Sequence, residues 1–222
     1  MTTVVKSPHS SEQIAAWLRG LLTIAWADGD FNQQEQELIA TLTREGLDST
    51  LNFGNLEAIT PEELAAGLGQ DQSAAENFLR TAVMVAIADG IYSVCENNLL
   101  YQFCQALKQP PAILEVLQQT LCDQQSATPS ATLIQLECDA LRPVRNWLDG
   151  LEVDDPRVAR FLCRMIPAQC PFERDVKLFG QKIVHIPPLC KINPLYEQLV
   201  GLRFRALSYL ADECGEDVSA YC

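Results

Sequence analysis

Residues 25–39 read AWADGDFNQQEQELI, and residues 86–100 read AIADGIYSVCENNLL. The two stretches align without a gap and share the pattern A-x-A-D-G-x-(F/Y)-x-x-x-E, with two apolar residues at matching positions further on. In each copy an Asp-Gly pair, which is a turn signal, separates an apolar stretch from a polar one. The repeat therefore predicts two units, each a helix, an Asp-Gly turn and a second helix.

Apolar periodicity extends the helical pattern along the chain. A helix over residues 11–27 would present one continuous apolar face, made of Ile14, Trp17, Leu18, Leu21, Leu22 and Ala25. Further helices are predicted over residues 33–44, 61–69, 74–88, 94–107, 110–122, 132–148, 156–166 and 171–179, with a last one that begins at Pro194. Thr60 is the expected cap of the helix over 61–69, and Asn193 is the expected cap of the last helix. The apolar stripe expected on the last helix consists of Leu195, Leu199, Leu202, Ala206 and Leu210. Because strand-like alternation is nowhere convincing and only residues 183–186 look extended, the sequence predicts an all-α fold.

The doubled motif resembles the TerB family, the tellurite-resistance fold that also occurs in DjlA-type proteins. The resemblance covers about residues 11–122 and implies a compact helical bundle with two pseudo-twofold halves. It also implies an acidic metal site at the two turns, formed here by Asp28, Asp30, Glu35, Asp89 and Glu96. Ile91 replaces the acid equivalent to Asp30, so the second copy offers a poorer set of ligands for a divalent cation.

A simpler interpretation of the acidic turns stays open. Asp28 and Asp89 would hold the turns, while Glu35 and Glu96 would stabilise helix N-termini through the helix dipole. The run from Asp28 resembles a calcium-binding loop, but it lacks the glycine at the sixth position and has Ile39 where the twelfth-position glutamate belongs.

A polar stretch with a proline, residues 124–130 (QQSATPS), is the best linker candidate. It predicts two helical units, residues 1–125 and 126–222. Charge supports the division, because residues 1–125 contain 5 Lys/Arg against 16 Asp/Glu, whereas residues 126–222 contain 11 against 13. The acidic first unit argues against nucleic acid or an anionic membrane as the main partner and favours a protein partner.

Residues 163–190 (CRMIPAQCPFERDVKLFGQKIVHIPPLC) carry three cysteines. Prolines next to Cys170 and near Cys190 place these thiols on stiff turns, where a metal site can gather them. With the later Cys214, the candidate ligands of an iron–sulfur cluster, or alternatively of zinc, are Cys163, Cys170, Cys190 and Cys214.

Nearby basic residues strengthen this prediction, because cations stabilise thiolates. They are Arg164, Arg174, Lys177, Lys182, Lys191, Arg203 and Arg205. The spacing of the cysteines matches neither a zinc ribbon nor a bacterial ferredoxin, so buried, metal-free thiols stay an equal alternative.

The second half of the chain resembles the cyanobacterial domain family labelled Mo-dependent nitrogenase C-terminal. The resemblance covers residues 131–222 and lies in the runs IPAQCPFERDVKLFG, HIPPLCKINPLYEQLVGLRFRAL and YLADECGEDV. It implies a cyanobacterial source and a cytoplasmic setting. The residues do not support nitrogenase activity, because the chain is short and contains no P-loop.

The composition argues against a membrane-spanning protein and against a secreted one. No apolar run approaches the roughly 20 residues of a membrane span, and the N-terminal residues lack the apolar core of a signal peptide. These features predict a cytoplasmic protein, in which nine cysteines are more often ligands, redox groups or core residues than disulfides.

The function predicted from these patterns is non-catalytic. The cysteine-bearing unit would hold an iron–sulfur cluster or metal and report redox or metal status, as a regulatory or stress-response protein. The acidic unit would bind a partner protein or a cation. One alternative is a metal-free interaction scaffold, and another is a thiol enzyme that uses Cys170 or Cys190 with His185.

Overall fold

The computed structural model describes residues 8–27, 58–88, 92–119, 140–166, 174–178, 181–186 and 193–221. Their α-helices are α1 (Ser11–Ala25), α3 (Pro61–Leu68), α4 (Gln72–Ala86), α5 (Val94–Ala106), α6 (Ala112–Leu117), α8 (Arg142–Asp149), α9 (Pro156–Met165) and α11 (Tyr196–Ser208). A π-helical turn, η2 (Tyr209–Glu213), continues α11, and a 3₁₀ turn, η3 (Ser219–Tyr221), follows. The predicted all-α class is confirmed.

Side-chain caps start most of these helices where the sequence places them. Ser10, Thr60 and Ser93 each form a reciprocal capping box with the residue three positions later. Asp71 and Asp155 accept hydrogen bonds from backbone amides in the first turns of α4 and α9. Because each cap satisfies backbone N–H groups that have no partner within the helix, it fixes where the helix begins.

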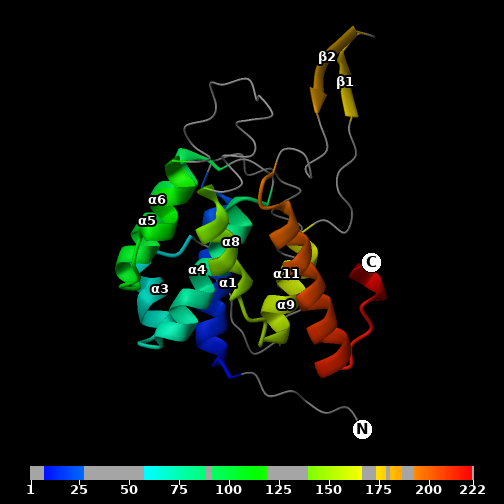
Figure 1. Ribbon diagram of the computed structural model, residues 1–222. Helices are drawn as coiled ribbons and strands as arrows, with labels where there is room; N and C mark the ends of the chain where they lie inside the picture. Colours follow the sequence, from blue (N-terminus) through cyan, green and yellow to red (C-terminus); the bar gives the residue numbers. More distant parts are fainter. Residues whose placement is uncertain are drawn as a thin grey trace.

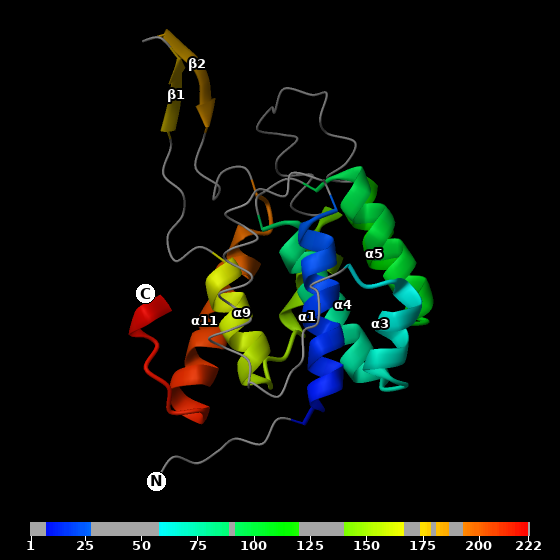
Figure 2. The ribbon, with the colours of Figure 1, turned by 180° about the vertical axis from the view of Figure 1, so that it is seen from behind.

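The helices pack around α1 and α4 (Figure 1). On one side lie α3 and α5, and on the other lie α9 and α11, an arrangement that the reverse view repeats (Figure 2). One hydrophobic core runs through the bundle and contains residues from both ends of the described chain, from Ile14 to Leu210. The interfaces on the two sides of α1 therefore share a continuous apolar interior.

Aromatic rings and small residues determine how closely α1 meets its neighbours. Trp17 of α1 meets Phe78 of α4 edge to face at 5.8 Å between ring centroids, and Phe78 meets Phe103 of α5 at 5.9 Å. A Cβ atom placed on Gly67 of α3 would lie 2.4 Å from the Cβ atom of Ala16. The close approach of α3 to α1 therefore requires glycine at this position.

Polar contacts also cross between the N-terminal and C-terminal helices. The Asn77 side chain donates to the Glu152 carbonyl at 2.7 Å and accepts from the Glu152 N–H at 2.9 Å. Arg80 donates through Nε to the Trp147 carbonyl at 2.8 Å, and its guanidinium lies 5.6 Å from the centroid of the Trp147 ring. These contacts tie α4 to α8 and to the loop after it.

The prediction of a helix over residues 171–179 is wrong. Residues Arg174–Leu178 form strand β1, which pairs antiparallel with β2 (Gln181–Ile186), and a register irregularity lies between Val176 and Lys177. The extended segment predicted over 183–186 is confirmed as part of β2. This hairpin is a small addition to a helical fold.

The start of the last helix also differs from the prediction. Asn193 was expected as the cap, yet α11 begins at Tyr196 and Leu195 holds the capping position without a side-chain hydrogen bond. Instead, the Asn193 amide donates to the Ile87 carbonyl and its oxygen accepts from the Leu195 N–H. Asn193 therefore joins the start of α11 to the end of α4. The predicted helix over 33–44 and the predicted linker lie outside the described residues.

Candidate functional site

A group of charged contacts lies where α9, α11 and residues 216–221 meet. Helix α9 begins at Pro156 because the Asp155 side chain caps it, and the buried Asp155 carboxylate also pairs with Arg157 at 2.8 Å. The buried face of α9 carries Val158, Phe161 and Leu162. That face sets α9 against α11, and the two helices lie side by side (Figures 1 and 2).

Helix α11 buries an apolar stripe along its length. All five residues of the stripe predicted from the sequence are buried: Leu195, Leu199, Leu202, Ala206 and Leu210. Arg203 lies on the same buried side and retains only 7 % of its exposure. Its guanidinium donates to the carbonyls of Cys163 and Ile166, which belong to the last turn of α9. Arg203 therefore joins α11 to the C-terminal end of α9.

A glycine turns the chain back after η2. Gly215 has φ +65°, a left-handed conformation that glycine adopts without steric cost. The following N–H, that of Glu216, donates to the Leu210 carbonyl at 2.9 Å, which closes the end of the helix. Residues 216–221, here called the C-terminal segment, then run back beside α9 and α11 (Figure 2).

Three arginines contact the C-terminal segment. Arg160 makes a two-point ion pair with the Glu216 carboxylate, with Nε to Oε2 at 3.0 Å. Arg203 donates to the Tyr221 carbonyl, and the Arg164 guanidinium lies 5.7 Å from the centroid of the Tyr221 ring. We name Arg160, Arg164 and Arg203 the arginine triad. The hydrogen bond to Glu216 raises the pKa of Arg160, although burial opposes the shift.

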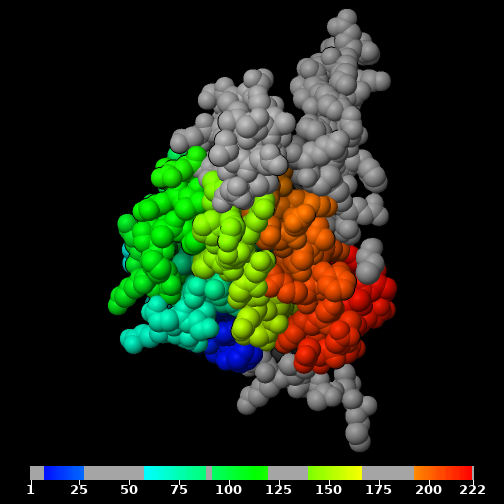
Figure 3. All heavy atoms as spheres, in the orientation of Figure 1, coloured from blue at the N-terminus to red at the C-terminus, as the bar shows by residue number. Residues whose placement is uncertain are grey.

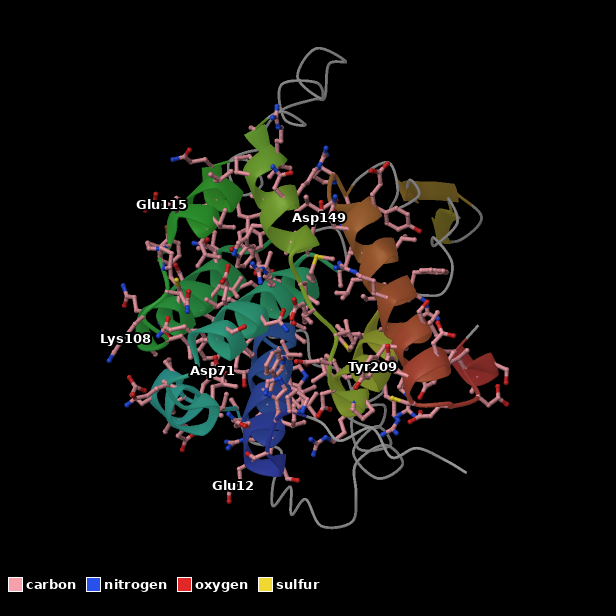
Figure 4. All side chains as sticks on the ribbon, turned by 60° about the horizontal axis from the view of Figure 1, so that its bottom comes forward. Glu12, Asp71, Lys108, Glu115, Asp149 and Tyr209 are labelled. Carbon is pink, nitrogen blue, oxygen red and sulfur yellow. The ribbon has the colours of Figure 1, made fainter. Side chains whose placement is uncertain are left out.

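Cys214 lies beside the arginine triad, at the end of η2. Burial raises the pKa of its thiol and the charge of Glu216 adds to the shift, while a hydrogen bond with Tyr209 and the charge of Arg160 oppose it. The Tyr209 hydroxyl also donates to the Asp154 carbonyl at 2.8 Å, and burial raises the pKa of that hydroxyl. Figure 4 places Tyr209 where α11 runs beside α9.

Of the four cysteines predicted as cluster ligands, two lie in the described part of the chain. Cys163 is buried in α9, and Cys214 is half-buried after η2. Although about 50 residues apart in sequence, they lie in elements that pack against each other. Cys170 and Cys190 fall outside the described residues, so the four-cysteine site stays a prediction.

Glu96 is the only predicted ligand of the acidic turns that the structure describes. Its carboxylate accepts a hydrogen bond from the Ser93 N–H at 2.8 Å and completes the capping box of α5. The macrodipole interpretation of this glutamate is therefore consistent with its position at the helix N-terminus. Asp28, Asp30, Glu35 and Asp89 lie outside the described residues, and the cation site stays a prediction.

Within the described ranges, no three His, Cys, Asp or Glu side chains are arranged as a metal site. Cys104 is buried in α5 and donates to the Gln109 carbonyl, and burial raises the pKa of its thiol. Cys95 is exposed on α5.

His185 pairs with Asp175 in the hairpin register, whereas Cys170 and Cys190 lie outside the described residues, so the thiol-enzyme alternative is untested.

The outward face of α11 carries an exposed apolar surface. Val200 and Phe204 keep 45 % and 69 % of their exposure, and their spacing of four residues makes them neighbours on the helix. Gly201 lies next to them, and no atom comes within 4 Å of a Cβ atom placed there. Figure 3 shows that α11 and the segment after it form one side of the molecular surface.

Sequence reasoning missed Arg160, because its partner lies 56 residues later. The signal available was its spacing of four residues from Arg164, which places both on one face of α9. The acidic cluster Asp212, Glu213, Glu216 and Asp217 does favour a pairing with basic residues, because the dipole at a helix C-terminus disfavours anions. The Arg160–Glu216 ion pair is such a contact, made by an arginine outside the group that was named.

Comparison with known proteins finds one family model that matches part of the chain. Residues 140–222, less than half of the chain, match the family model described as Mo-dependent nitrogenase C-terminus. The match begins just before α8 and includes α9, α11 and the arginine triad. No curated protein and no solved structure matches the chain.

These observations define a helical protein of which residues 140–222 are similar to the Mo-dependent nitrogenase C-terminus family. The resemblance of residues 11–122 to the TerB family stays a prediction. Among the described residues, no helix combines the length and hydropathy needed to cross a membrane.

Proposed function

We propose that this chain is a non-catalytic adaptor that binds an amphipathic helix of a partner protein on the outward face of α11. The observation that supports it is the exposed pair Val200 and Phe204. A phenylalanine left 69 % exposed beside another apolar side chain is a recurrent feature of surfaces that become buried in complexes.

Gly201 favours a helix as the occupant of this surface. Gly201 has no side chain, and no atom lies within 4 Å of a Cβ atom placed there, so the helix surface beside Phe204 is open. A partner helix that crosses α11 there can bring its backbone close while its apolar side chains flank Phe204. Burial of Phe204 would then contribute on the order of 1–3 kcal/mol to binding.

The test is the set of proteins that co-purify with the chain from its native cells. Phe204→Ser removes the aromatic anchor, and Val94→Ser is the matched control because Val94 is 62 % exposed on α5, away from this surface. We expect the same partners with the wild type and Val94→Ser, and their loss with Phe204→Ser. Identical partners with all three chains would refute the proposal. Both side chains are exposed, so neither substitution should unfold the protein.

A cysteine-ligated iron–sulfur or zinc centre is the second proposal, in which the adaptor also reports redox or metal status. The packing of α9 against η2 favours this proposal. Cys163 lies in α9, and Cys214 directly follows η2. The pKa of the Cys214 thiol is raised in the absence of metal, and a metal that binds there would have to displace the thiol proton. The centre would supply a redox-active or structural metal held by thiolates.

Metal analysis of anaerobically purified protein tests this second proposal. We expect about one cluster or one zinc ion per chain, with loss of the metal in Cys163→Ser. Cys95→Ser is the control, since Cys95 is exposed on α5. Colourless protein without stoichiometric iron or zinc would refute the metal centre and favour a metal-free adaptor. Divalent-cation binding at the acidic turns is tested separately, by a rise in melting temperature with added Ca²⁺ or Mg²⁺.

A further inference from the structure

We propose that the arginine triad is a recognition site for an acidic peptide that carries an aromatic residue, and that residues 216–221 occupy this site as a tethered competitor. The inference goes beyond the adaptor surface on α11 and does not depend on it. It follows from the chemistry of the contacts that hold the C-terminal segment.

Each arginine of the triad contacts a different feature of the segment. Arg160 binds the Glu216 carboxylate at two points, Arg203 binds the Tyr221 carbonyl, and Arg164 lies over the Tyr221 ring. A carboxylate, a main-chain carbonyl and an aromatic face are groups that any peptide with the same spacing can offer. The contacts therefore define a peptide motif: a glutamate followed five residues later by an aromatic residue.

Arg203 is the most deeply buried arginine of the triad. The guanidinium is 7 % exposed, and its hydrogen-bond partners are the backbone carbonyls of Cys163, Ile166 and Tyr221, which carry no net charge. Because none of these partners in the described part of the chain is an anion, the buried cation is attracted to an anion that comes near. Of the three arginines, Arg160 has its carboxylate partner in the C-terminal segment itself.

The C-terminal segment is attached in a way that allows it to leave. Asp217, Ser219 and Ala220 are exposed, and only Val218 and Tyr221 pack against the core. Gly215, with φ +65°, separates the segment from η2, so a rotation there can lift residues 216–221 while α11 stays folded. Opening such a peripheral segment needs less free energy than unfolding the whole protein.

Tethering gives the C-terminal segment an advantage over any peptide in solution. A short tether provides an effective concentration on the order of millimolar, so a free peptide with the same contacts competes poorly. A partner gains access when its segment binds more strongly or when it also contacts a neighbouring surface. Competition from the C-terminal segment therefore favours partners that bind this site and a second surface at the same time.

The experiment uses a labelled peptide with the sequence of residues 215–221, GEDVSAY, and measures its binding by fluorescence anisotropy. We expect at least tenfold tighter binding to a chain that ends at Gly215 than to the full chain. In the shortened chain, Arg160→Ala should weaken binding at least tenfold, while Arg142→Ala on the exposed start of α8 should not. Equal binding to the shortened and full chains, or no binding to a folded shortened chain, would overturn the proposal.

A second variant covers the case in which the shortened chain does not fold. Glu216→Gln combined with Tyr221→Ala keeps the full length but removes two of the three contacts. We expect this double variant to bind the labelled peptide at least tenfold more tightly than the wild type, and less tightly as salt is added. No gain over the wild type would show that residues 216–221 are a structural part of the fold. The assay contains no partner protein, so its result is independent of the test of Phe204.

Discussion

His9 connects the segment before α1 to the loop before α9. Its Nε2 atom lies 3.3 Å from the Asp154 carboxylate, and its ring centroid lies 5.6 Å from that of Trp17. The hydrogen bond with Asp154 raises the pKa of His9 above its ordinary value of 6.5, against the opposing effect of burial. The charges of Asp154, Asp155 and Asp71 act in the same direction as the hydrogen bond.

This contact predicts a pH dependence of stability. Because the folded-state pKa of His9 is raised, its contribution is full below about pH 6.5 and is lost as the pH rises through the folded-state pKa. We expect the free energy of unfolding of the wild type to exceed that of His9→Asn by about 0.5 kcal/mol more at pH 6 than at pH 8.5, a small value because Asp154 is partly exposed to screening solvent. Urea unfolding at both pH values measures it. An unchanged difference would contradict the assignment.

Asn77 joins α4 to the loop after α8 through the backbone of Glu152. The side chain is 7 % exposed and bonds both the N–H and the carbonyl of Glu152. Asn77→Ala would leave two backbone groups without partners, and we expect a loss of about 1–3 kcal/mol in the free energy of unfolding. Asn98→Ala is the control, since Asn98 is exposed on α5. Similar losses for both variants would contradict this role for Asn77.

Individual residues also show what the sequence alone can predict. The stripe from Leu195 to Leu210 and the cap at Thr60 follow from local spacing, and both are confirmed. Arg160 contacts Glu216 across 56 residues, Arg203 contacts Ile166 across 37, and Asn193 contacts Ile87 across 106, so no local pattern indicates those contacts. The residues of the candidate site are defined by packing of distant elements, which the sequence does not display.

At the scale of elements, the same reasoning explains the error over residues 171–179. The segment contains residues that suit a helix, such as Glu173, Lys177 and Leu178, and the prediction followed them. The better signal was two runs, residues 174–178 and 181–186, separated by two residues that include Gly180. Two strands that satisfy each other's backbone hydrogen bonds overrode the local helix propensity.

Two glycines in helices predict opposite effects of the same substitution. Gly67→Ala in α3 places a Cβ atom 2.4 Å from that of Ala16, so α3 must move away from α1 at a cost of about 1–3 kcal/mol. Gly201→Ala in α11 meets no atom within 4 Å, so it should raise the free energy of unfolding by about 0.5–1 kcal/mol. Denaturant unfolding of the two variants measures both. A gain at Gly67 or a loss at Gly201 would contradict this packing.

At the scale of the whole molecule, one hydrophobic core contains residues from both predicted units, 1–125 and 126–222. The predicted boundary lies outside the described residues, and the division stays a prediction. The matched family segment, residues 140–222, shares one hydrophobic core with α1, α4 and α5. Trp147 of α8 donates to the Glu76 carboxylate of α4 at 3.0 Å, and Asn193 bonds the end of α4 from the start of α11.

This shared interior predicts that the N-terminal and C-terminal helices unfold together. Removing α9 and α11 would expose part of the apolar face of α1, because α1 contacts α9 and its buried residues belong to the common core. The free energy for opening either half alone therefore approaches that of global unfolding. In native-state hydrogen exchange, we expect the slowest amides of α1, α4, α9 and α11 to report one common free energy and one common denaturant slope.

The predicted two-unit organisation would give a different result in the same measurement. Independent units would show two groups of slowest amides, with separate free energies and smaller denaturant slopes that match the surface each unit exposes. Asn77→Ala sharpens the comparison, because it removes a contact between α4 and the loop before α9. If the interior is shared, this variant lowers the exchange free energy of α1 and α11 equally. If it lowers neither, or only one, then the two halves keep their stability separately and the chain has two folding units.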